Sequence, residues 1–225
     1  MKRTLIVLCL LLLCASCLPK TPAAAPTATQ IVPSSPTNDG STPISQIQGI
    51  THRSPLEGNT IAKVTGVVTA VDGEGFYLQS LAPDDDERTS EAIYVDLEAY
   101  SNAKRGDQVL IEDGWVREWN PAGLGENSLT ITTLVAKKVS ILSQNQPLPT
   151  PVVIGQGGRM ILNQVIENDV HGYVGQSKQP IDPQEDGMDF FESLEGMLVQ
   201  INNARAVSTR NGYNEVSVVA DNGQD

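Results

Sequence analysis

The stretch "TIAKVTGVVTAV" (Thr60–Val71) decides the fold that the sequence predicts. It is rich in β-branched residues, which favour strands. Its apolar alternation slips at Gly66-Val67-Val68, and a slip at a glycine indicates a β-bulge that bends the strand. We therefore expect one long strand that turns a corner of a small barrel.

Four further β-type runs follow, separated by turn residues. The runs are Gly75–Ser80, Ala92–Leu97, a run that ends at Trp119 after a turn at 105–107, and Ser128–Leu142. In the run that ends at Trp119, the side chains of Val109, Ile111 and Trp115 are expected on one face. Five strands, the first long and bent at a glycine, predict a mainly β protein with an OB-type barrel over residues 44–145. A short helix is expected near residues 98–103.

A proline-rich break at residues 145–151 separates the barrel from residues 146–225, which we expect to form a second small β-rich unit that is incomplete. The sequence "DFFESLEGMLVQI" (189–201) lies in this unit. A strand at its end, residues 197–201, is expected to pair with residues 214–220.

The carboxylates of this stretch are expected to cap and to face solvent. Asp189 and Glu192 have the spacing of a capping box at the start of a helical turn. Phe191 and Leu194 would then share the inner face of the turn, and Gly196 would end it. This interpretation makes the stretch scaffold and not an acid/base site.

The first 43 residues predict export. Lys2 and Arg3 precede an apolar run, Leu5–Leu13, that is too short to span a bilayer. Residues 1–16 are similar to a bacterial lipoprotein signal peptide, with Cys17 as the lipidated first mature residue, although Cys14 stands where leucine is usual. Residues 17–43 are rich in Pro, Ala, Ser and Thr and predict a tether. We expect anchoring on the outer side of the bacterial cell membrane, or secretion.

Composition limits the partners. Removal of residues 1–16 would leave 13 basic residues against 27 acidic ones and Cys17 as the remaining cysteine, so the mature chain has a net charge of −14 and no disulfide. An acidic protein is repelled by phosphate backbones, so contact with nucleic acid needs a local basic patch or a metal bridge.

Several segments resemble a known family. "KVTGVVTAV", "GFYLQS", "TSEAIYV" and "RGDQVLIEDGWVREW" resemble the OB-like domain near the amino terminus of bacterial extracellular nucleases. "DFFESLEGM" and "VVADNG" resemble the segment that follows it in those proteins. The resemblance covers roughly residues 44–223. It implies a catalytic domain of the endonuclease/exonuclease/phosphatase class after these modules, with a divalent metal, Mg²⁺ or Ca²⁺, as its cofactor.

No catalytic residue is predicted within the 225 residues. The resemblance implies Gly-Asp-x-Asn and Ser-Asp-His elements, and neither His52 nor His171 lies in such a setting. The two histidines are far apart and lack cysteine partners, so a zinc site is not expected. The chain is therefore expected to be a fragment, or a chain cut short after its accessory modules, of a larger hydrolase.

Aromatic and basic side chains on the barrel strands are candidates for binding single-stranded or duplex nucleic acid, because bases stack on exposed aromatic rings. The candidates are Tyr77, Trp115, Arg117, Trp119, Lys104 and Arg105. Alternation along a strand sends about half of such residues into the core, so packing is the competing interpretation.

Asp84, Asp85 and Asp86 form the densest acidic run. A hard cation such as Ca²⁺ could bind its oxygens, but the EF-hand spacing is absent. A run of like charges is ordinarily a solvated loop, and both interpretations stay open at this point.

Two functions follow from the sequence. The first is a non-catalytic accessory region of a surface-anchored or secreted nuclease or phosphodiesterase, which positions substrate or packs on the catalytic domain. The alternative is a self-contained envelope lipoprotein that recognises an oligosaccharide, a peptide or a protein partner. A third, an active hydrolase within these residues, lacks the ligands it needs.

Overall fold

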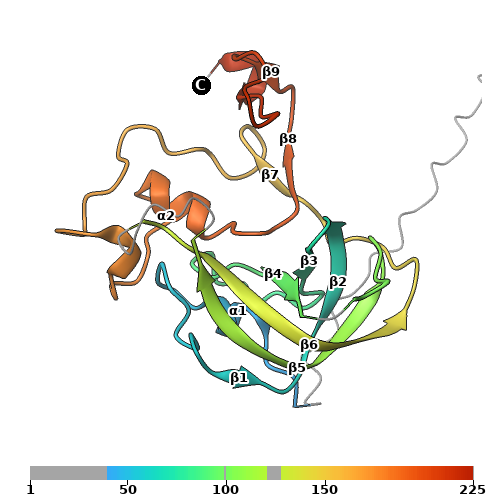
Figure 1. Ribbon diagram of the computed structural model, residues 1–225. Coiled ribbons are helices and arrows are strands. Elements are labelled where there is room, and N and C mark those ends of the chain that lie inside the picture. Colours follow the sequence, from blue (N-terminus) through green and yellow to red (C-terminus); the bar gives the residue numbers. More distant parts are fainter. Residues whose placement is uncertain (1–39, 99, 121–127, 225) are drawn as a thin grey trace, which may run out of the picture. The chain divides into compact units, whose positions relative to one another are not determined.

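Five strands close into a barrel in the order β5-β2-β3-β4-β6, and β6 pairs with β5 to complete the closure. The computed structural model describes residues 40–98, 100–120 and 128–224 (Figure 1). The barrel strands are β2 (Val64–Val71), β3 (Gly75–Gln79), β4 (Ala92–Leu97), β5 (Gln108–Trp119) and β6 (Ile131–Ser143). β4 and β6 pair in parallel and the other barrel pairs are antiparallel. The expected OB-type barrel in a mainly β protein is confirmed.

The first predicted strand is two strands. β1 (Thr60–Ile61) adds to the edge of β5, and β2 begins at Val64. The register shift in β2 lies between Val68 and Ala70, after the glycine instead of at it. Gly66 has a different role: a Cβ there would lie 2.6 Å from the carbonyl oxygen of Gln79, so glycine permits the close approach of β2 and β3.

The two longest strands, β5 and β6, lie side by side along their whole length (Figure 1). Register shifts around Asp113 interrupt their pairing and change which residues face inward. Val109 and Ile111 are buried as expected, but beyond the shift Gly114 and Val116 face the core. Trp115 lies on the outer face, so its expected place beside Val109 and Ile111 was wrong.

A short helix, α1 (Ile44–Gln48), precedes the barrel and inserts Ile44 and Ile47 into its core. The helix expected near residues 98–103 is wrong, since no helix occurs at the described positions 98 and 100–103. Partly buried Leu97 and Ala103 pack on the core from this connection without helical structure. The buried barrel core consists of Ile44, Ile47, Ile61, Val64, Val68, Phe76, Leu78, Ile93, Val95, Val109, Ile111, Val116, Leu134 and Ala136.

Short elements make up the segment after the barrel. They are β7 (Val152–Ile154), the 3-10 helix η1 (Val174–Gln176), α2 (Gly187–Glu192), β8 (Val199–Ile201), β9 (Arg205–Ala206), β10 (Val218–Val219) and the 3-10 turn η2 (Asp221–Gly223). β8 pairs in parallel with β7, whereas β10 pairs with β9. The expected pairing of 197–201 with 214–220 was therefore wrong, because β7 and β9 take the places of the expected partners.

The turn around α2 is built differently from the capping box that the sequence predicted. The helix begins at Gly187, Asp186 occupies the N-cap position, and Asp189 lies inside the helix without a side-chain capping bond. Phe190 is the buried aromatic and Phe191 is 55% exposed, so Phe191 does not share the inner face with Leu194. Gly196, at φ +69°, ends the turn as expected.

The described residues of the barrel and of the following segment belong to one compact unit. The predicted signal peptide, Cys17 and the tether up to residue 39 lie outside the described residues. Within the part of the chain that is described, no helix has both the length and the apolar character needed to cross a bilayer.

Candidate functional site

Three aromatic side chains form a row on the outer face of the barrel. Tyr77 of β3 and Tyr94 of β4 are direct cross-strand partners, and their ring centroids lie 5.2 Å apart at 62°. Trp119, at the end of β5, stacks on Tyr94 with centroids 6.3 Å apart and planes at 25°. Alternation explains the placement, because the neighbours Phe76, Leu78, Ile93 and Val95 all face the core. We call Tyr77, Tyr94 and Trp119 the aromatic row.

Carboxylates flank the aromatic row. The Tyr94 hydroxyl donates to both carboxylate oxygens of Asp72, each at 3.1 Å. Partial desolvation raises the pKa of Asp72, but hydrogen bonds from the backbone amides of Glu74 and Gly75 and from the Tyr94 hydroxyl outweigh it. The net effect is a lowered pKa. Burial and the Asp72 carboxylate raise the pKa of Tyr94, so the hydroxyl stays a neutral donor.

Arg117 lies next to the row and is paired with an acid. Its Nη2 donates to Asp96 Oδ2 at 2.6 Å. Thr133 of β6 is the register partner of both Tyr94 and Arg117, so these two side chains flank it on the same face. The guanidinium charge is largely balanced, and the face as a whole is not basic.

The structure brings together some of the predicted nucleic-acid residues and separates others. Tyr77, Arg117 and Trp119 gather with Tyr94, and Trp115 lies on the same face of β5 two residues before Arg117. Lys104 and Arg105 precede β5, whereas Trp119 ends it, so they lie at opposite ends of a 12-residue strand. Arg105 Nε donates to the backbone carbonyl of Thr69 at 3.1 Å. Thr69 Oγ1 in turn donates to the Tyr77 carbonyl at 3.4 Å. Arg105 therefore lies nearer to the Tyr77 end of the aromatic row than its place on the chain suggests, whereas Trp119 lies at the other end of β5.

The acidic loop at residues 84–86 satisfies its own oxygens. The carboxylate of Asp84 accepts from the Thr89 hydroxyl and from the Asp86 amide, at 2.9 to 3.1 Å. Asp86 is ion-paired with Arg88 at 2.7 Å, which lowers the pKa of Asp86 to about 2. Asp85 adopts φ +65°. These contacts support the solvated-loop interpretation, and they leave few free oxygens for a hard cation such as Ca²⁺.

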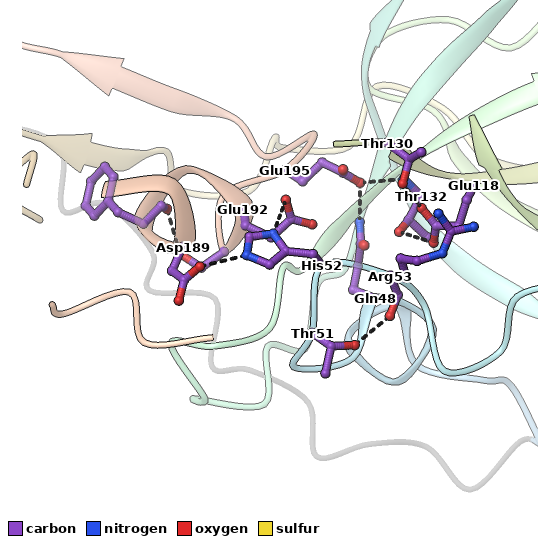
Figure 2. A network of polar contacts seen from close by, with 12 residues as sticks. Gln48, Thr51, His52, Arg53, Glu118, Thr130, Thr132, Asp189, Glu192 and Glu195 are labelled. Carbon is purple, nitrogen blue, oxygen red and sulfur yellow. Dashed lines mark hydrogen bonds and ion pairs between the residues drawn. The ribbon is translucent and has the colours of Figure 1, made fainter. Parts of the chain in front are cut away.

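A second polar group is buried between the barrel and α2 (Figure 2). His52 Nε2 lies 2.8 Å from Asp189 Oδ1, and His52 Nδ1 lies 3.2 Å from Glu192 Oε2. Burial lowers the pKa of His52, but the hydrogen bonds to Asp189 and Glu192 outweigh it and raise the pKa to about 9. The imidazole is 2% exposed, and an acid/base catalyst must reach its substrate. This burial favours a structural or ion-binding role.

Glu195 extends this group toward the barrel (Figure 2). Its Oε1 accepts from Gln48 Nε2 at 3.2 Å and from the Thr132 amide at 3.0 Å. Burial and the nearby Glu192 raise the pKa of Glu195 well above its usual range. The expectation that the carboxylates of 189–201 only cap and face solvent was therefore wrong. Because 137 residues separate His52 from Asp189, no local sequence pattern could have paired them.

The comparisons with known proteins cover parts of the chain. A family model described as "Domain of unknown function (DUF8508)" matches residues 153–225, which is less than half of the chain. Among solved structures, the chain is similar to "OBody AM3L15 bound to hen egg-white lysozyme", at 22% identity and a TM-score of 0.29, over 44% of this chain and 88% of that one. No curated protein matches.

Proposed function

We propose that these residues are a non-catalytic accessory region of an exported nuclease or phosphodiesterase, and that the barrel holds a single-stranded stretch of the substrate. The observation that carries the proposal is the aromatic row, in which Trp119 is 39% exposed at one end. Stacking of a base on such a ring contributes about 1 to 3 kcal/mol. The resemblance to extracellular nucleases supports the substrate class.

Charge shapes the mode of binding in this proposal. Arg117 is paired with Asp96, and Lys104 and Arg105 lie at the other end of β5. Few phosphates would be neutralised, so the affinity would come from stacking and would depend weakly on salt. A single strand fits better than a duplex, because a duplex hides the faces of its bases.

Membrane attachment and a catalytic domain complete the proposed function. Lipidation of Cys17 would hold the region on the outer side of the bacterial membrane, and a cleaved signal without lipidation would release it. The catalytic domain, with Mg²⁺ or Ca²⁺, would act on the strand that the barrel positions. Reading the gene beyond codon 225 tests this directly, since the proposal needs Gly-Asp-x-Asn and Ser-Asp-His elements there.

One observation favours the alternative, an envelope binding lipoprotein that recognises an oligosaccharide. The carboxylates of Asp72 and Asp96 flank the aromatic row, and carboxylates accept hydrogen bonds from sugar hydroxyls. A neutral sugar also avoids the repulsion that phosphates meet on an acidic protein.

Titration of the full chain with an oligothymidylate and with a neutral oligosaccharide distinguishes the two functions. For the first function, Trp119→Ala is expected to weaken oligothymidylate binding by roughly 10- to 100-fold. Tyr213→Ala is the matched control, because Tyr213 is 86% exposed and belongs to the turn between β9 and β10. Binding of the oligosaccharide alone supports the alternative, and loss of neither ligand in Trp119→Ala contradicts both.

A further inference from the structure

Asp186 is buried without a proper partner. The residue is 0% exposed, and no donor among the described residues meets hydrogen-bond geometry with its Oδ1 or Oδ2. Burial raises the pKa of Asp186, and the nearby backbone amide of Asn168 opposes this shift. Burial of a carboxylate without compensation is costly, so a proton or a nearby cation must neutralise Asp186.

Three ligand atoms converge in the surroundings of Asp186, which interacts electrostatically with two of the residues that supply them. One atom each from His52, Glu167 and Asp189 lie within 4.8 Å of one another. Glu167 Oε2 is also buried without a donor, whereas its Oε1 accepts from the amides of Asp169 and Val170 at 2.8 and 2.9 Å. The bonds that fix Glu167 therefore leave one oxygen directed at the group.

Among the described residues, the carboxylates of the group outnumber the protein cations that contact them. Asp186 interacts electrostatically with Glu167, Asp169 and Asp189. Within the described ranges, none of the ion pairs joins a lysine or arginine to any of these acids. The imidazole of His52 is the one basic group in contact, through Asp189.

We propose that His52, Glu167 and Asp189 bind one divalent metal ion, and that the buried Asp186 carboxylate adds negative charge near them. Ligand atoms about 2.0 to 2.4 Å from a common ion lie at most about 4 to 5 Å apart, which agrees with the 4.8 Å limit on this group. The 2.8 Å between His52 Nε2 and Asp189 Oδ1 suits two adjacent ligands of one ion.

The surroundings orient the ligands. Glu192 Oε2 lies 3.2 Å from His52 Nδ1, so its charge favours a proton on Nδ1 and leaves Nε2 available to the ion. The Asp182 amide donates to Asp189 Oδ2 at 2.6 Å and fixes that carboxylate. One imidazole with two carboxylates favours Mn²⁺ or Zn²⁺ over Ca²⁺ and Mg²⁺, which prefer oxygen alone.

The ion would have a structural role that is independent of ligand binding by the barrel. His52 precedes the barrel, Glu167 belongs to the loop between β7 and η1, and Asp186 and Asp189 belong to α2 and its N-cap. An ion shared by these segments would fasten α2 to the barrel and stabilise the folded state. Glu167 is half-buried beside exposed Asn168 and Asp169, which gives the ion a route from solvent.

Calorimetric titration of the EDTA-treated full chain with Mn²⁺, Zn²⁺, Ca²⁺ and Mg²⁺ in turn tests the site. One equivalent of Mn²⁺ or Zn²⁺ is expected to bind and to raise Tm. Glu167→Gln is expected to weaken that binding at least about tenfold, and Asp85→Asn, in the exposed acidic loop, is expected to leave it unchanged. Pulsed EPR of bound Mn²⁺ is expected to show coupling to one imidazole nitrogen.

The outcomes that would overturn the site are distinct. No binding of any of the four ions at millimolar concentration removes it, as does equal binding by Glu167→Gln. Binding of Ca²⁺ alone, or bound Mn²⁺ without nitrogen coupling, removes His52 as a ligand and with it the proposed set. If Glu167→Gln fails to fold, Asp189→Asn replaces it with the same expected loss of binding.

Discussion

The barrel and the segment that follows it are stabilised in different ways. Fourteen buried apolar residues form the barrel core, whereas the segment has a core of three, Ile154, Phe190 and Leu194. The segment is joined to the barrel by polar contacts instead: His52 with Asp189, Gln48 and Thr132 with Glu195, and Gln79 with Leu198. The barrel therefore depends on side-chain volume, and the segment depends on hydrogen-bond partners.

The largest expected effect is on the barrel core. Phe76 is 1% exposed and is among the largest fully buried side chains. Phe76→Ala is expected to lower the free energy of unfolding by about 3 to 5 kcal/mol, because it leaves a cavity. Urea denaturation followed by circular dichroism measures the loss. A loss below about 1 kcal/mol would mean that the barrel is not held by its apolar core.

Removing the buried ion pair between His52 and Asp189 tests whether polar contacts stabilise the segment after the barrel. Asp189→Asn, measured after EDTA treatment, is expected to cost about 3 kcal/mol, because it removes the nearer of the two anionic partners of the buried His52 imidazole. Amide hydrogen exchange should rise in α2 and β8 while β5 and β6 stay protected. An equal rise of exchange in β5 and β6 would contradict the idea that these polar contacts stabilise the segment and not the barrel.

The neighbouring phenylalanines of α2 provide an internal control. Phe190 is 1% exposed, and the Arg159 guanidinium lies 5.0 Å from its ring centroid, whereas Phe191 is 55% exposed. Phe190→Ala is expected to loosen α2 by about 2 to 4 kcal/mol of local stability, and Phe191→Ala by less than about 1. Hydrogen exchange of the α2 amides measures both. The reverse order would restore the inner face predicted from the sequence.

The contrast also explains how far the sequence could be interpreted. Alternation and turn residues located β3, β4 and the barrel type, because burial of one face imposes a period of two on the chain. Trp115 was misplaced because a register shift near Asp113 reverses the period without a sequence signal. The partners of Asp189 could not be found, since His52 lies 137 residues away and a contact between distant residues follows from the whole fold. In the same way, Tyr77 and Trp119 were identifiable as aromatics on strands, but their gathering around Tyr94 depends on closure of the barrel.

The smallest expected effect on stability comes from one buried carboxylate at the edge of the barrel. Glu91, 7% exposed beside the acidic loop, accepts from the Asp84 amide at 2.7 Å. Burial raises the pKa of Glu91 to about 7, with the Asp84 amide opposing and the Asp84 carboxylate adding to the shift. The folded state thus keeps a proton that the unfolded chain releases above its ordinary pKa, so stability falls as pH rises from about 4.5 to about 7.

Glu91→Gln removes this ionisation and keeps an oxygen that can accept from the Asp84 amide. It is expected to stabilise the protein by about 1 to 2 kcal/mol at pH 8, less than the full shift would give because solvent is near, and to change nothing at pH 4. Glu74→Gln, at an exposed glutamate of the β2–β3 turn, is the control, with an expected change within about 0.5 kcal/mol at both pH values. Urea midpoints at the two pH values measure the difference. A gain of the same size at pH 4 would show that the substitution acts through packing and not through ionisation. The stability of this edge of the barrel would then depend on side-chain volume, as that of the core does.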